Sequence, residues 1–245
     1  MKTRPSHKIL IVNICFFISS LNSLAQKTQI NINAYSGIFS YRGNGVTATS
    51  SIITGYPFGV PSVPYPFTKN VYGTGKEFSY SIEIQAIKKG KNNFLYGTGL
   101  AFEMLASKIR INTVYYIGDY SEPVYPAAGS TRLTNSTINV NPFVGKRFSR
   151  PKYSMDVLTG IDIGIGLVSR EKGSSKRLSD GHEFTTNNKL ANPGIDFRPR
   201  IQFKAQFNKT GLLLGYSLGI TNINRGSNST VHSGFFRTGI SYTLK

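Results

Sequence analysis

Two histidines, His182 and His232, are the residues best suited to chemistry in the body of the chain. His182 is followed by Glu183 and closely preceded by Asp180, and His232 is followed by Ser233. A histidine beside a carboxylate or a hydroxyl can act as a general base or activate a nucleophile. Both histidines fall in long polar segments, however, and neither local sequence matches a hydrolase motif. Because an isolated loop histidine is usually only solvated, we predict that the protein is not an enzyme.

Other reactive patterns are scarce. The single cysteine, Cys15, lies in the apolar N-terminal segment, so the rest of the chain offers no thiolate to a metal or substrate. A lipoprotein signal using Cys15 is disfavoured, because Asn13-Ile14 stand where small residues are required. The segment Gly73-Thr74-Gly75-Lys76 lacks the upstream glycine and the loop length of a phosphate-binding motif. We therefore expect no cofactor and no metal site.

The N-terminus has the order of a secretory signal. Three basic residues precede an apolar run over Ile9–Ile18, and Ser23 and Ala25 supply small residues for a signal peptidase. The apolar run is too short to span a bilayer as a helix. We predict a signal peptide over residues 1–25 and one domain over residues 26–245.

The strongest pattern in that domain is alternation with a period of two. In Ile195–Phe207, apolar residues and Pro199 occupy one face, while charged residues and glutamines occupy the other. Successive side chains of a strand point to opposite faces, so each such segment reads as a strand with one apolar wall. Eight segments share the pattern: Ile30–Ile38, Phe78–Ile87, Tyr96–Met104, Ile138–Gly145, Tyr153–Leu167, Ile195–Phe207, Leu212–Thr221 and Phe236–Leu244.

The connections between these segments alternate in length. Short ones cover Lys88–Asn93, Ser149–Lys152 and Asn208–Thr210, and long ones cover Arg42–Gly75, Ser107–Arg132, Ser169–Leu190 and Asn222–His232. This division is typical of bacterial outer-membrane barrels. The sequence predicts an all-β fold: an eight-stranded antiparallel transmembrane β-barrel with short periplasmic turns and long extracellular loops. A soluble β-sandwich is the alternative. Pro142 and Pro199 lie inside predicted strands, where each should mark a bulge or a strand end.

The same alternation predicts which charges face the lumen. Five acids and five bases are expected there: Glu83, Glu103, Arg147, Asp156, Asp162, Asp196, Arg198, Arg200, Lys204 and Arg237. An eight-stranded barrel is only wide enough for side chains to fill. Buried charges are tolerated when they are paired, so we expect a salt-bridged plug. A narrow ion or proton path is the alternative. Inward glycines such as Gly99 would make room for the long side chains.

The formal net charge is +18, from 29 Lys and Arg against 11 Asp and Glu. The bases form no single cluster and the chain is predicted to be secreted, so nucleic acid is not an expected partner. Basic residues in the short turns suit anionic headgroups at a membrane rim: Lys88, Lys89, Lys91, Arg150, Lys152 and Lys209. The expected partners are outer-membrane lipids, including lipopolysaccharide, and other proteins of an outer-membrane complex.

The first long connection contains a segment rich in proline and aromatic residues, from Tyr56 to Phe67. Its candidate binding residues are Tyr56, Phe58, Tyr65 and Phe67. Three functions remain open at this point. The leading hypothesis is a non-enzymatic accessory or scaffold subunit that binds through its long loops and its lipid-facing wall. The alternatives are a small ion or solute channel and, less favoured, a lipid-modifying barrel enzyme.

Several segments resemble the PorT-like outer-membrane β-barrel family of Bacteroidota, a family of small barrels of the OmpA/OmpX type. They are Leu24-Ala25-Gln26, Tyr35-Ser36-Gly37, the strand Leu95–Glu103 after a basic turn, and the C-terminal Gly239–Lys245. The resemblance covers nearly all of the predicted mature chain, but its motifs are loose. The chain ends in Lys245 rather than an aromatic residue, so Tyr242 would have to replace the terminal aromatic signal. The resemblance implies a barrel in the outer membrane, and it implies function only through members that assist secretion machinery.

Overall fold

The computed structural model describes residues 28–55, 66–117, 123–224 and 228–244. The predicted signal peptide lies outside these residues. Eight strands form the barrel: β1 (Thr28–Arg42), β4 (Gly75–Lys89), β5 (Phe94–Ile117), β6 (Val124–Ser149), β7 (Ser154–Arg177), β9 (Ile195–Phe207), β10 (Thr210–Leu218) and β11 (His232–Thr243). Three further strands are β2 (Thr49–Gly55), β3 (Phe67–Thr68) and β8 (Glu183–Leu190), and a single 3₁₀ turn covers Lys91–Asn93.

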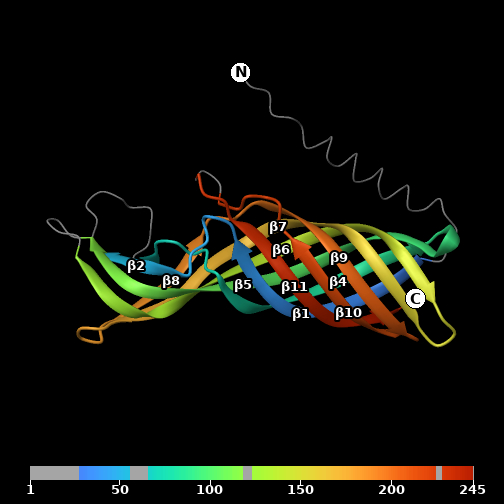
Figure 1. Ribbon diagram of the computed structural model, residues 1–245, viewed down its shortest axis with the longest axis horizontal. Coiled ribbons are helices and arrows are strands. Elements are labelled where there is room, and N and C mark those ends of the chain that lie inside the picture. The colour runs from blue at the N-terminus through green and yellow to red at the C-terminus, as the bar shows by residue number, and fades with distance from the viewer. Residues whose placement is uncertain (1–27, 56–65, 118–122, 225–227, 245) are drawn as a thin grey trace, which may run out of the picture.

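The eight long strands close into a ring. Neighbours pair in the order β5-β4-β1-β11-β10-β9-β7-β6, and β6 pairs again with β5. Every pairing in the ring is antiparallel. The predicted eight-stranded antiparallel barrel is therefore confirmed. The three short turns lie at one end, here called the short-turn rim, and the long connections lie at the other, here called the long-loop rim (Figure 1).

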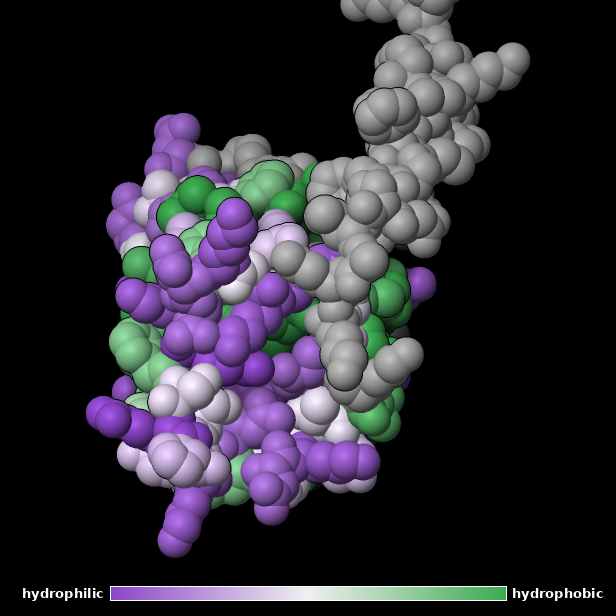
Figure 2. All heavy atoms as spheres, turned by 90° about the vertical axis from the view of Figure 1, so that its right-hand side faces the viewer, coloured by the Kyte–Doolittle hydropathy of each residue, from purple (hydrophilic) through white to green (hydrophobic). Residues whose placement is uncertain are grey.

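The outer wall of the barrel is apolar. Exposed large hydrophobic residues recur at every second position, as in Ile195, Phe197, Ile201 and Phe203 of β9, while the residues between them point inward. Viewed from the short-turn rim, hydrophilic residues cover the end of the barrel and hydrophobic ones gather along its sides (Figure 2). A water-soluble protein would bury such a wall, whereas a bilayer solvates it. The barrel is thus a transmembrane one. Among the described residues, no helix is long and apolar enough to span a bilayer.

Much of what we predicted as loop at the long-loop rim is strand. Ser107–Arg132 is the continuation of β5 and β6, which pair as far as Tyr115 and Val124. Ser169–Leu190 contains the end of β7 and all of β8, which pair with each other. In the first long connection, β2 runs parallel to the end of β5, and β3 pairs with β2. The sheet therefore extends beyond the apolar wall, as Figure 1 shows at its left end. We call these parts of β2, β3, β5, β6, β7 and β8 the extension.

The sequence predicts a bulge or a strand end at Pro142 and at Pro199, and the structure differs at the two positions. Pro142 lies in the middle of β6, where the register with β5 and with β7 is unbroken, so the predicted bulge or strand end is wrong there. The ladder with β7 has a gap at Asn141 and Pro142, where the proline has no N–H to donate, and the same register resumes at Phe143. Pro199 lies one residue beyond Arg200, the last residue of β9 that pairs with β10. It marks the end of one ladder without ending the strand.

Candidate functional site in the lumen and on the outer wall

Seven of the ten predicted lumen charges form one continuous chain of ion pairs. Arg200 Nη1 lies 3.3 Å from Glu83 Oε1 and 3.3 Å from Asp162 Oδ1. Arg237 then bridges Asp162 and Glu103, at 3.2 Å from Glu103 Oε1. Arg198 Nη2 lies 2.5 Å from the other Glu103 oxygen, and its Nε lies 3.7 Å from Asp196. Apart from Asp196, whose side chain is 14% exposed, these side chains are at most 2% exposed.

Neutral donors surround Glu83 at one end of this chain. Glu83 accepts hydrogen bonds from Asn33 Nδ2 at 2.8 Å, Tyr35 Oη at 2.7 Å and Asn141 Nδ2 at 2.8 Å. Gly99 faces the same carboxylate, and a Cβ built there would lie 2.3 Å from Glu83 Oε1. This close approach agrees with the expected role of inward glycines as room for charged side chains. A buried carboxylate with so many donors stays ionised and fixed.

The other three lumen charges lie nearer the short-turn rim. Arg147 holds Asp156 in a bidentate pair, with both N–O distances at 2.7 Å. Lys204 is 1% exposed and is the cross-strand partner of Asp156. Among the basic turn residues of this rim, Lys88 is also buried, whereas Lys89, Lys91, Arg150, Lys152 and Lys209 are exposed as expected.

Apolar layers bound the ion-pair chain on both sides. Toward the short-turn rim, Ile87, Leu95, Phe143 and Leu158 form one cluster. Toward the long-loop rim a larger cluster fills the lumen: Phe39, Tyr41, Leu105, Leu133, Ile223, Val231 and Phe235. On β7, Leu158 lies between the charged residues Asp156 and Asp162. On β11, Phe235 is the next inward-facing residue from Arg237 in the direction of the long-loop rim. The ten lumen charges sum to zero, but the ion-paired ones comprise five acids and four arginines, and Lys204 stands opposite Asp156 without an ion pair.

His182 and His232 lie in separate places, each with its own neighbours. His182 lies in the turn between β7 and β8, where Arg177 pairs with Asp180. The hydrogen bond from Arg177 lowers the pKa of Asp180 to about 2, which makes this carboxylate a poor base near neutral pH. His232 and Ser233 point to opposite faces of β11. The Ser233 hydroxyl donates to Asp196 at 2.6 Å, and His232 Nδ1 lies 3.0 Å from the Thr221 carbonyl oxygen.

The predicted aromatic binding loop is described only at its end. Tyr56, Phe58 and Tyr65 lie outside the described residues. Phe67 is half-buried in β3, where it pairs with Ile53. Its neighbour Thr68 donates its N–H to Glu171 Oε1 of β7 at 2.9 Å, which ties the first long connection to the extension. Within the described ranges, no three histidine, cysteine or acidic residues gather as metal ligands.

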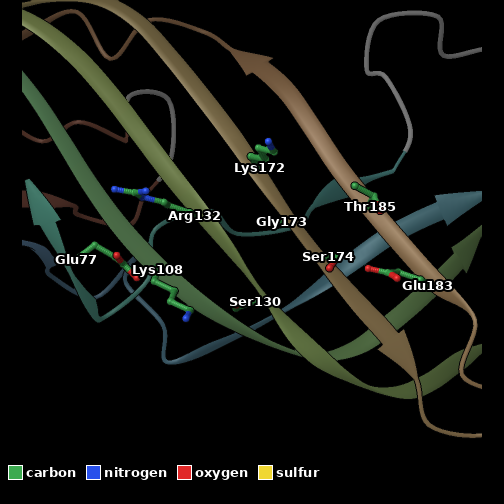
Figure 3. A pocket seen from close by; sticks show the side chains of 9 residues that line it. All are labelled: Glu77, Lys108, Ser130, Arg132, Lys172, Gly173, Ser174, Glu183 and Thr185. Carbon is green, nitrogen blue, oxygen red and sulfur yellow. The ribbon is translucent and has the colours of Figure 1, made fainter.

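One feature of the outer wall was not predicted. Lys108, Arg132 and Lys172 project from the neighbouring strands β5, β6 and β7 of the extension and line a depression of about 480 Å³ (Figure 3). Glu77 and Glu183 also line it. The sequence predicts loops over these segments. Bases at positions 108 and 110, and again at 170 and 172, were the signal of a strand with a basic face.

Comparison with known proteins finds likeness in architecture only. No family model and no curated protein matches the sequence, so the PorT-like family is not confirmed. The solved structure of the attachment invasion locus protein Ail of Yersinia pestis, in complex with the heparin analogue sucrose octasulfate, is 10% identical. It covers 90% of this chain and 100% of its own, with a TM-score of 0.34.

Two further structures are similar to the same extent. Neisserial surface protein A is 8% identical, covers 89% of this chain and 99% of its own, and has a TM-score of 0.36. The outer membrane protease OmpT from Escherichia coli is 8% identical, covers 91% of this chain and 99% of its own, and has a TM-score of 0.40. All three are outer-membrane β-barrel proteins.

Proposed function

We propose that this chain is a non-enzymatic outer-membrane protein that works as an accessory or scaffold subunit of a membrane complex. The observation that carries the proposal is the filled lumen. A chain of buried ion pairs lies between two apolar clusters, so the interior serves the rigidity of the barrel. Function then resides on the surfaces that remain: the lipid-facing wall, where outer-leaflet lipids including lipopolysaccharide bind, and the extension, which holds protein partners.

The extension supports this role because its strands are held by ladder pairing and side-chain contacts. The β5–β6 ladder continues from the barrel into the extension. The hydrogen bond from Thr68 to Glu171 attaches the first long connection to it. A preorganised surface loses less conformational freedom on binding than a mobile loop does. This favours a stable protein interface at the long-loop rim, which faces the cell exterior in the proposed orientation.

The test is affinity purification of the tagged protein from its native outer membrane after mild detergent extraction. We expect a reproducible protein companion. A variant in which an Asn-Gly turn joins the register partners Arg110 and Ser130 removes the tip of the extension and should lose that companion. The matched control is Arg150→Gln with Lys152→Gln at the opposite rim, which should keep it.

Folding of each variant is checked by its altered gel mobility before and after boiling. Recovery of the folded protein with no reproducible companion would contradict the scaffold proposal. Retention of the companion by the shortened variant would move the interface away from the extension tip.

A further inference from the structure

Three bases form a row across the outer face of the extension. Lys108 of β5 is the register partner of Arg132 of β6, and Arg132 is the register partner of Lys172 of β7. All three side chains are exposed, and Figure 3 shows them on three adjacent strands around one depression. Directly opposed residues in a sheet lie about 4.5–5.5 Å apart at their Cβ atoms. The row therefore concentrates three positive charges within the width of three strands.

Within the described part of the chain no ion pair holds this row, and the bases outnumber the two acids at the same depression. No ion pair there involves Lys108, Arg132 or Lys172, and Arg132 donates only to the Phe78 carbonyl oxygen at 3.4 Å. The two acids that line the depression, Glu77 and Glu183, make no ion pair either. Like charges opposed across a sheet are destabilising. A bound anion would remove that cost.

The same bases are part of a wider basic face. Exposed outward residues of β5 to β8 include seven bases and one acid: Lys108, Arg110, Arg132, Arg170, Lys172, Lys176, Lys189 and Glu183. Lys176 and Glu183 are register partners, which leaves the other six bases unopposed by an acid. The excess positive charge lies on one side of the molecule, on the outer face of β5, β6 and β7.

The position of the row points to a lipid. On β7, the exposed residues Ile165, Leu167 and Val168 are followed by Arg170 and Lys172 on the same outer wall. A β-bulge at Leu167 shifts the inward residues from even to odd numbers. Just beyond it the outer wall turns from apolar to basic. A molecule whose chains lie on the apolar part has its headgroup beside the row. That arrangement fits an amphiphile better than a soluble anion.

We propose that Lys108, Arg132 and Lys172 bind the phosphate groups of a glycolipid of the outer leaflet, with the Ser130 and Ser174 hydroxyls at the same depression as additional donors. Guanidinium and ammonium groups are the usual partners of phosphate. A row of them next to the apolar wall attracts the headgroup, and this attraction adds to that between the lipid chains and the wall. The assignment rests on the proposed outer-membrane placement, but it needs no protein partner. Either proposal, the lipid site or the scaffold role, can therefore fail while the other stands.

The experiment compares lipid binding by the purified full-length protein in detergent, using native mass spectrometry. The probes are diphosphorylated lipid A and the same lipid after removal of its phosphates. The test variant carries Lys108→Gln, Arg132→Gln and Lys172→Gln. The control carries Lys146→Gln, Arg150→Gln and Lys152→Gln, an equal loss of charge at the short-turn rim, where these residues are exposed.

We expect the test variant to lose affinity for the phosphorylated lipid by about a hundredfold, and the control by less than about threefold. Binding of the dephosphorylated lipid should be weak and similar in all three proteins. Salt should weaken binding to the wild-type protein, which gives a test that needs no variant. Equal binding by the test variant, or no effect of removing the phosphates, would overturn the assignment. So would equally tight binding of water-soluble sucrose octasulfate to the same row.

Discussion

Arg237 is the residue on which the lumen network depends most. Its guanidinium pairs with both Glu103 and Asp162 and donates a hydrogen bond to the Ser217 hydroxyl oxygen at 2.7 Å. It also lies over the Phe235 ring, 4.9 Å from the centroid. Replacing it by methionine leaves two buried carboxylates short of a partner. We expect Arg237→Met to lower the free energy of unfolding by about 3–5 kcal/mol, measured by urea titration in lipid vesicles.

The control for this variant is Arg147→Met, which breaks the pair with Asp156 near the rim. The Arg147 side chain is 14% exposed against 1% for Arg237, and Lys204 stands opposite Asp156 as a second base. Arg147→Met should therefore lower the free energy of unfolding clearly less than Arg237→Met does. Equal losses for the two variants would mean that burial does not set the strength of the network.

Gly99 tests whether the lumen is as tightly filled as it looks. The Cβ of an alanine would lie 2.3 Å from Glu83 Oε1, and Glu83 is held by three neutral donors and Arg200. The carboxylate must move and lose part of that coordination. We expect Gly99→Ala to cost about 1–3 kcal/mol in the same urea titration.

Gly90 offers a matched comparison because a Cβ there meets nothing closer than 3.6 Å. Gly90→Ala should change the stability by no more than about 0.5 kcal/mol. If Gly99→Ala were equally harmless, the lumen around Glu83 would have to be loose.

At the scale of single elements, the sequence predicted the membrane part of each strand and missed the rest. Within the bilayer one face of a strand must be apolar, so Ile195–Phe207 alternates clearly and its bounds were predicted correctly. In the extension both faces can be polar, as in the end of β7, so the apolar alternation disappears there and only the alternation of bases remains. Bulges such as the one at Leu167 also reverse the inward and outward positions. Ion-pair partners could not be predicted either, because they depend on register.

Hydrogen exchange followed by mass spectrometry tests the strand character of the extension. Backbone amides over residues 108–115 should be protected, since this part of β5 is paired with β6 and, over most of its length, also with β2. The connection over residues 191–194, which contains no strand, should exchange much faster. Equally fast exchange in both segments would contradict the structure and favour a loop over Ser107–Arg132.

At the scale of the whole molecule, the barrel, its strand count and the alternation of short and long connections followed from the sequence because the bilayer imposes them. The same pattern placed the ten charges on the inward face, and the structure brings seven of them into one chain. It could not show the apolar clusters above and below that chain. Those clusters combine residues of distant strands, such as Phe39, Leu105 and Phe235, whose proximity depends on closure of the ring.

A filled lumen is the central claim, and single-channel recording in planar bilayers tests it most directly. The purified protein should insert without producing conductance steps, while a porin added to the same bilayers gives steps of the usual size. Apolar side chains around Phe235 and around Leu158 lie on either side of the buried ion pairs, so we expect that ions do not pass. Stable steps from the wild-type protein, altered in size or ion selectivity by Arg237→Met, would show that the interior conducts and would contradict the account.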